Sequence, residues 1–352
     1  MAITVTEFGK TESGQEVKQY VIENARGMRA VLLNYGAVLQ KLLVPDKTGA
    51  MLDVVWGYQD VKHYEENKPN FGATVGRNAN RIGKGEVEIN GVSYQMAKND
   101  GENNLHGGIP GYHQRMWRGI IADDNKVEFS IISPDGDQGL PGNVQVTVSY
   151  KLTNDNELQI SYHGLPDQDT IINLTNHSYF NLEGQDSDTV LEQEVWIDAD
   201  AFTPTAADLI PTGEIRPVEA TPLDFRQWRT LGTDIDAEYE PLTFAGGYDH
   251  NFVLNGEGHR LAAKLRCKKS GILMEVFTDL PGMQLYTGNF LDQEAGGKEG
   301  KVYQKRSAVC FETQAFPDAP HHPDFPTTLV WAGAEYETCT CYRFSVLEQA
   351  HS

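Results

Sequence analysis

Hydrophobic and polar residues alternate with a period of two along much of this chain. Residues 127–131, 144–150 and 158–162 each show this alternation. Residues 30–33 and 37–39 add two apolar segments on either side of a short polar break. Alternation of this kind places one face of a strand on a core and the other face in water. The pattern therefore predicts strands over most of the sequence.

Turn signals separate these segments, whereas signals for helices are scarce. Asn90-Gly91, Asp135-Gly136 and Asn255-Gly256 predict tight turns. Only two short helices are expected, at residues 61–67 and 234–239. Repeated strands joined by hairpin turns predict an all-β fold, a large antiparallel sandwich or barrel with few short helices. No linker or repeat divides the chain, so a single domain over residues 1–352 is expected.

Composition and charge narrow the classes of partner. A chain of 352 residues can bury a large core without a disulfide or metal. It carries 29 basic and 50 acidic residues, a formal net charge of −21. So acidic a surface repels nucleic acids and anionic lipids, so no nucleic-acid or membrane partner is expected. No signal peptide or membrane span is recognisable, and the four cysteines are interpreted as structural thiols, which together predict a cytoplasmic protein.

Five segments interrupt the strand pattern with polar groups beside glycines or aromatic residues. They are residues 76–83, 103–108, 173–182, 246–252 and 310–314. A single histidine or glutamate in such a segment is more often structural than catalytic. Together, however, the segments supply histidines, carboxylates, an arginine and several asparagines, which suit a ligand rich in hydroxyl groups. Aromatic faces can pack on a sugar ring, and histidine with glutamate forms a common general acid–base pair.

The order of these motifs resembles the aldose 1-epimerase family, the galactose mutarotases. The most specific motif is Thr175-Asn176-His177-Ser178-Tyr179-Phe180-Asn181-Leu182, followed by Asn104-Leu105-His106-Gly107-Gly108. The remaining ones are Asn80-Arg81-Ile82, Tyr248-Asp249-His250, Pro281-Gly282-Met283-Gln284-Leu285-Tyr286-Thr287-Gly288-Asn289 and Glu312. The resemblance runs from about residue 35 to residue 345.

The resemblance implies a β-sandwich of the galactose mutarotase type with a sugar cleft across one sheet. It implies that Glu312 is the general base that takes the proton of the anomeric hydroxyl, and that His177 is the general acid that protonates the ring oxygen. The ring then opens, C1–C2 rotates, and closure on the other carbonyl face gives the opposite anomer. The implied substrate-binding residues are Asn80, Arg81, His106, Asp249 and Gln284.

The expected substrate is a free aldose such as D-galactose or D-glucose, with no cofactor and no metal, because no hydride moves and no strong nucleophile forms. Ordinary pKa values support the two catalytic roles. A glutamate with a pKa near 4.3 is ionised, and a histidine with a pKa near 6.5 needs only a nearby carboxylate to be protonated at neutral pH. A monomer is expected.

Three alternatives remain at this stage. A metal hydrolase could use His106, His177, Asp249, His250 and Glu312, although no zinc-binding spacing supports it. A non-catalytic sugar-binding protein would not need both His177 and Glu312. A hexose-6-phosphate epimerase would need a basic cluster for the phosphate, for which Arg77 and Arg81 are candidates. The preferred aldose is not identified.

Overall fold

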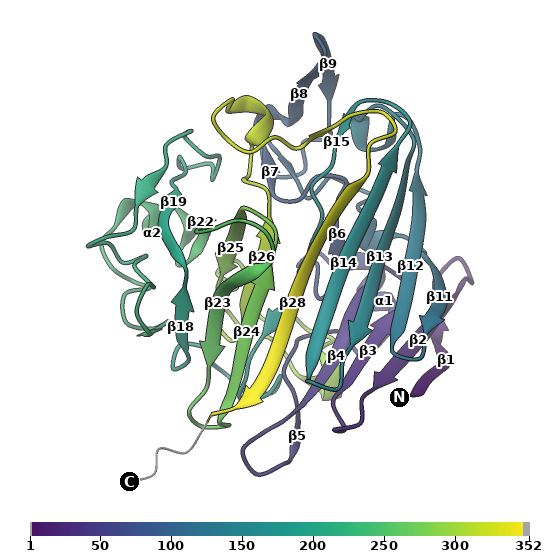
Figure 1. Ribbon diagram of the computed structural model, residues 1–352, viewed down its shortest axis with the longest axis vertical. Helices are drawn as coiled ribbons and strands as arrows, with labels where there is room; N and C mark the ends of the chain where they lie inside the picture. Colours follow the sequence, from purple (N-terminus) through teal and green to yellow (C-terminus); the bar gives the residue numbers. More distant parts are fainter. Residues whose placement is uncertain (1, 348–352) are drawn as a thin grey trace.

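The computed structural model describes residues 2–347 and is built mainly from three antiparallel sheets. In spatial order, the nine-stranded sheet contains β11 (Arg118–Asp123), β12 (Lys126–Ser133), β13 (Val144–Leu152), β14 (Glu157–Pro166), β28 (Tyr336–Val346), β24 (Ile272–Thr278), β23 (Arg260–Arg266), β18 (Glu194–Ile197) and β21 (Arg229–Thr230). Figure 1 shows β28, the last strand of the chain, between β14 and β24.

Two smaller sheets complete the sandwich. The six-stranded sheet contains β17 (Tyr179–Phe180), β26 (Val309–Gln314), β25 (Gly282–Tyr286), β22 (Asp249–Leu254), β19 (Ala199–Thr203) and β20 (Arg216–Pro217). The five-stranded sheet contains β1 (Ala2–Lys10), β2 (Glu16–Glu23), β3 (Arg29–Leu33), β4 (Val38–Pro45) and β5 (Met51–Asp53).

Short ribbons and helices fill the connections. The two-stranded ribbons pair β6 (Thr74–Val75) with β16 (Thr175–Asn176), β7 (Arg81–Ile82) with β10 (Asn104–Leu105), β8 (Glu86–Ile89) with β9 (Val92–Gln95), and β15 (Thr170–Ile171) with β27 (Leu329–Val330). The helices are α1 (Val61–Glu66) and α2 (Glu240–Ala245), with 3-10 turns at Gly83–Gly85, Tyr112–Gln114, Asp137–Gly139, Lys298–Gly300 and Ala319–His321. Among residues 2–347, no helix has the length and apolar character needed to cross a bilayer.

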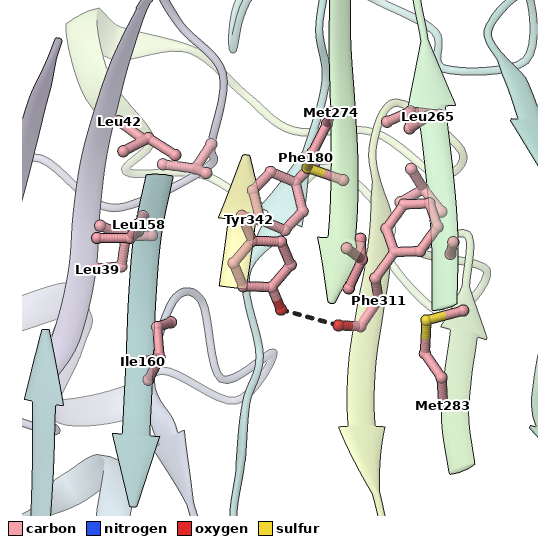
Figure 2. Close-up of a cluster of buried hydrophobic side chains, with 14 of the residues drawn as sticks. Leu39, Leu42, Leu158, Ile160, Phe180, Leu265, Met274, Met283, Phe311 and Tyr342 are labelled. Atoms are coloured by element: carbon pink, nitrogen blue, oxygen red, sulfur yellow. Dashed lines mark hydrogen bonds between the residues drawn. The ribbon is translucent and has the colours of Figure 1, made fainter. Parts of the chain in front are cut away.

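The main core lies between the nine-stranded sheet and the two smaller sheets. Buried side chains alternate with partly exposed ones along β14, so its inner face meets the other layer. Figure 2 shows Leu39 and Leu42 of β4 facing Leu158 and Ile160 of β14. The Tyr342 hydroxyl donates to the Phe311 carbonyl at 3.0 Å and ties β28 to β26. The predicted all-β sandwich is confirmed.

The helix expected at residues 234–239 is wrong, whereas the one expected at 61–67 is confirmed as α1. Turns occupy residues 231–236, and α2 begins only at Glu240. Pro241 lies in its first turn, where the fixed φ of proline and its missing N–H are tolerated. Helix α1 begins after Asp60, whose side chain accepts the His63 N–H as a cap. All four cysteines are free thiols, as interpreted from the sequence.

Candidate active site

A cavity of about 520 Å³ collects six of the seven predicted site residues. They are Asn80, Arg81, His106, His177, Asp249 and Glu312. Asp249 belongs to β22, Glu312 to β26 and Arg81 to β7, whereas Asn80, His106 and His177 lie on connections that directly flank the short ribbons. The cavity therefore forms where the six-stranded sheet meets the loops that carry the polar motifs.

Strand β26 explains how the chain presents Glu312. All six of its residues are buried, unlike the half-exposed strands of the nine-stranded sheet. Val309 and Phe311 belong to the main core. Because side chains alternate along a strand, Glu312 points to the opposite face, toward the cavity. A strand buried on both faces thus carries an ionisable group at the centre of the fold.

Reciprocal contacts hold Asn80 and His106 together. Leu105 pairs with Arg81 in the ribbon of β7 and β10. The His106 N–H donates to the Asn80 carbonyl at 3.0 Å, and the Asn80 N–H donates to His106 Nδ1 at 3.1 Å. Both residues adopt a positive φ, 62° at Asn80 and 55° at His106, a conformation in which Asn and His are enriched. Two motifs distant in the sequence therefore reach the same edge of the cavity.

The Asn80 N–H determines the tautomer of His106. A neutral imidazole carries one N–H, and a ring nitrogen that accepts a hydrogen bond is unprotonated. Burial lowers the pKa of His106 well below its usual range, and His177 and Arg81 add to this shift. The ring is therefore neutral at pH 7, with its proton on Nε2. This makes His106 a hydrogen-bond donor for a ligand.

The hydrogen bond from the Asn80 N–H to His106 Nδ1 also affects whether a metal could bind. Ligand atoms of His106, His177 and Glu312 lie within 4.8 Å of one another, and two histidines with one carboxylate form a known type of zinc site. Ligation through Nε2 would move the His106 proton to Nδ1, against the Asn80 N–H. Metal-bound histidines instead donate from the second nitrogen to an acceptor. The residues present therefore fit a hydroxylated ligand better than a metal ion.

His177 and Glu312 form a buried pair. His177 Nε2 lies 3.6 Å from Glu312 Oε1, and their side chains are only 6% and 3% exposed. Tyr179 stacks on the imidazole, with ring centroids 5.0 Å apart, and Cys310 Sγ lies 3.6 Å from Nδ1. These contacts direct Nε2 toward the carboxylate. Glu312 Oε2 is buried and has no hydrogen-bond partner within residues 2–347.

Burial changes the protonation expected from the sequence. It lowers the pKa of His177 to about 3 and, with the nearby Asp249 charge, raises the pKa of Glu312 well above its usual range. Removing water disfavours the charged form of either group. The expectation that the nearby carboxylate keeps His177 protonated at neutral pH is wrong for the free cavity. Whenever the pair in the empty cavity holds one proton, these shifts favour Glu312 as its site and a neutral His177.

Asp249 and Arg81 form the polar wall beside this pair. Arg81 Nε donates to Asp100 Oδ2 at 2.7 Å, and Arg81 Nη1 lies 3.8 Å from Asp249 Oδ2. Burial raises the pKa of Asp249, while Arg81 and a hydrogen bond from Gln284 oppose the shift. The wall thus combines a cation, a hydrogen-bonded carboxylate and the Asn80 amide, all suited to hydroxyl groups.

Some predicted residues do not reach the cavity. Gln284 lies behind Asp249 and donates to its Oδ1 at 2.6 Å. His250 faces away, because it follows Asp249 on β22, and its ring packs edge-on against Phe202. Arg77 is fully buried and hydrogen-bonded to Ser133 and to the carbonyls of Ser133, Pro134 and Pro141. Arg77 therefore adds no positive charge to the cavity.

Other lining residues were not among the predicted site residues. Tyr286 and Phe290 stack with centroids 6.1 Å apart, and the Phe290 side chain remains largely exposed. Tyr286 stands inside a motif that was noted in the sequence, but an aromatic residue on a strand usually belongs to the core. Asp100 lies in a polar turn with no distinguishing pattern. Only its pairing with Arg81 marks it as part of the site.

A comparison with protein families matches residues 18–343 to the model described as aldose 1-epimerase. Among curated proteins, the galactose mutarotase of Bos taurus is 41% identical over 98% of this chain and 99% of its own length. The human galactose mutarotase is 40% identical over the same shares. The aldose 1-epimerase of Escherichia coli is 33% identical over 94% of this chain and 96% of its own length.

Solved structures agree with these matches. The aldose epimerase homologue of C. elegans superimposes with a TM-score of 0.87 and 34% identity, covering 93% of this chain and 98% of its own. The galactose 1-epimerase of Lactobacillus acidophilus gives a TM-score of 0.86 and 26% identity, covering 99% and 100%. The likeness extends over nearly the whole of each chain.

Proposed function

Because this chain belongs to the aldose 1-epimerase family and is an aldose 1-epimerase, an isomerase, we propose that it interconverts the anomers of free aldohexoses such as D-galactose and D-glucose. Glu312 acts as general base and His177 as general acid. The observation that carries these roles is the buried contact of 3.6 Å between His177 Nε2 and Glu312 Oε1 in the wall of the cavity.

The reaction uses one proton shared by the pair. When the sugar binds, its hydroxyl groups supply the hydrogen bonds that the ionised Glu312 and the protonated His177 lack in the empty cavity. Glu312 then takes the proton of the anomeric hydroxyl, and His177 gives its proton to the ring oxygen. Because burial makes this carboxylate a stronger base and this imidazolium a stronger acid, both transfers are favoured.

Ring opening returns the pair to the state that burial favours. The open aldehyde faces a protonated Glu312 and a neutral His177, the distribution preferred in the empty cavity. Rotation about C1–C2 turns the other carbonyl face toward the former ring oxygen. Reversal of both proton transfers closes the ring as the opposite anomer and restores the enzyme.

The remaining polar residues bind and orient the sugar. His106 donates from Nε2, Arg81 and Asn80 donate to hydroxyl oxygens, and Asp249 accepts hydroxyl protons. Gln284 acts from behind by holding Asp249. This changes the predicted role of Gln284 from direct binding to support.

Charge around the cavity favours a free sugar over a sugar phosphate. Among the residues that the structure describes, Lys68 and Arg81 are the cations that line the cavity. The acidic lining residues are Asp100, Asp249, Asp292, Glu294 and Glu312. A phosphate dianion would meet mostly like charge, which disfavours binding by several kcal/mol. A free hexose experiences no such repulsion.

Polarimetry of freshly dissolved α-D-galactose, α-D-glucose and their 6-phosphates tests this proposal. We expect kcat/KM to be about a hundredfold higher for the free sugars, since like-charge repulsion corresponds to at least that factor. Equal or faster reaction of a 6-phosphate would favour the hexose-phosphate alternative. Binding of galactose without acceleration of mutarotation would favour a non-catalytic sugar-binding protein.

We further propose that the protein is a monomeric, cytoplasmic enzyme of galactose and hexose metabolism. No nucleic-acid or membrane partner is expected. Four free cysteines suit a reducing compartment. The net charge of −21 opposes association with polyanions. Light scattering after size exclusion checks the monomer, for which we expect a mass near 39.1 kDa.

A further inference from the structure

A chain of side-chain amides lies behind the wall of the cavity. Gln284 Nε2 donates to Asp249 Oδ1 at 2.6 Å. Gln314 Nε2 donates in turn to Gln284 Oε1 at 3.2 Å. Asn80 Nδ2 donates to Gln314 Oε1 at 3.4 Å. Gln314 therefore connects two residues of the cavity wall, Asn80 and Asp249, although it does not line the cavity itself.

Gln314 is placed there by the strand pattern. It lies two residues after Glu312 on β26, so both side chains point to the same face. Its side chain is fully buried. Gly282 pairs with Gln314 on β25, and a Cβ at Gly282 would lie 2.5 Å from Asn251 Oδ1. The glycine thus leaves room for the Asn251 amide beneath the site.

The amide of Gln314 is held in one orientation. Its Nε2 also donates to Asn251 Oδ1 at 3.2 Å, so both hydrogens of its amide group are used. The backbone N–H of the residue after Asn80 donates to Asn80 Oδ1 at 2.8 Å, so Asn80 presents its Nδ2 to Gln314 Oε1. With the Gln314 amide fixed, Gln284 must present its oxygen to Gln314 and its nitrogen to Asp249. A reversed Gln284 amide would place an oxygen against the Asp249 carboxylate.

We propose that Gln314 is a positioning residue, which orients the Gln284 amide and, through it, the Asp249 carboxylate for binding of a sugar hydroxyl. This inference rests on the proposed function, in which Asp249 binds the substrate. Gln314 does not touch the substrate and takes no part in proton transfer. Its removal should therefore weaken substrate binding and leave the chemical step intact. The longer contact to Asn80 contributes less, because hydrogen bonds weaken with distance.

The test is a double-mutant cycle on KM and kcat for α-D-galactose. Gln314→Met keeps the size of the side chain and removes its hydrogen bonds. We expect KM to rise by up to about tenfold, as for loss of a neutral hydrogen bond, with kcat within about twofold. In an Asp249→Ala background, the same substitution should change KM by less than about twofold. Gln284→Met should reproduce the effect of Gln314→Met.

Gln193→Met is the matched control. Gln193 is also a buried glutamine, hydrogen-bonded to Asn181 Oδ1, but it lies away from the cavity. Its substitution should lower thermal stability and leave KM unchanged. An unchanged KM in Gln314→Met, or a tenfold rise that persists in Asp249→Ala, would overturn the inference alone. A wild-type KM in Asp249→Ala would instead overturn the proposed binding role of Asp249, and the inference with it.

Discussion

At the scale of single residues, burial moves the pKa values of His177 and Glu312 in opposite directions. Together the two shifts favour the carboxylate as the site of a shared proton. The catalytic cycle needs one proton on the pair, whichever partner carries it. The activity should therefore follow the protonation of the pair and not that of an ordinary histidine.

A shared proton on the buried pair predicts an unusual pH dependence of kcat/KM, the quantity that reflects the pKa values of groups in the free enzyme. On the acidic side, activity falls only when a second proton binds His177, whose pKa is about 3, and removes the base. On the alkaline side, activity falls when the raised pKa of Glu312 is passed and the shared proton is lost. Polarimetry corrected for the uncatalysed rate should show no loss of activity on acidification until the pH approaches about 3. A loss on acidification centred near pH 6.5, the ordinary histidine value, would contradict this expectation.

Residue types and their motifs predicted which groups carry the proposed chemistry, but the sequence could not supply their surroundings. Glu312 and His177 stand in recognisable motifs, and the structure brings them together. Their protonation depends on burial, which no local pattern contains. The place of Gln284 behind Asp249, and that of Asp100 beside Arg81, depend on strand pairing and loop paths between distant segments.

At the scale of elements, period-two alternation predicted the long strands well because one of their faces meets solvent. The fully buried β26 is harder to assign, since its second face meets the cavity instead of water. The two-residue ribbons that place Asn80 and His106 are too short for any periodicity. The helix predicted at residues 234–239 was misplaced for a related reason. Turns and short helices use similar polar residues, so a short local pattern does not distinguish them.

Arg77 acts as the anchor of the turn that leads to Asn80. Its side chain is fully buried, with Nη1 2.8 Å from the Pro141 carbonyl and Nη2 2.7 Å from Ser133 Oγ. Arg77→Lys keeps the charge but loses the planar set of donors, so some buried acceptors lose their partners. Because buried acceptors left without a donor are costly, we expect a loss of about 3 kcal/mol in the free energy of unfolding, measured with denaturant.

The control is Arg26→Lys, because Arg26 forms only an exposed ion pair with Asp155. Such surface substitutions change stability by about 0.5 kcal/mol or less. If Arg77→Lys were as stable as Arg26→Lys, Arg77 would not anchor this turn.

At the scale of the whole molecule, the sandwich brings distant parts of the sequence to one cavity. The six-stranded sheet supplies Asp249 and Glu312, and β7 and its neighbouring loops supply Asn80, Arg81 and His106. A core formed by all three sheets supports the arrangement. That residues 1–352 form one domain stays a prediction, since it includes residues outside those described.

The proposed function depends most on Glu312 as the general base of an aldose 1-epimerase. The most direct test is the kcat of Glu312→Gln for α-D-galactose, measured by polarimetry. Glu312 is almost fully buried and its Oε2 has no partner within residues 2–347, so the neutral isostere should fold with equal or greater stability. Glu335→Gln, a change at an exposed carboxylate, is the control. We expect Glu312→Gln to lower kcat by about 10²–10⁴ and Glu335→Gln to leave it unchanged. A folded Glu312→Gln enzyme with wild-type kcat would contradict the account.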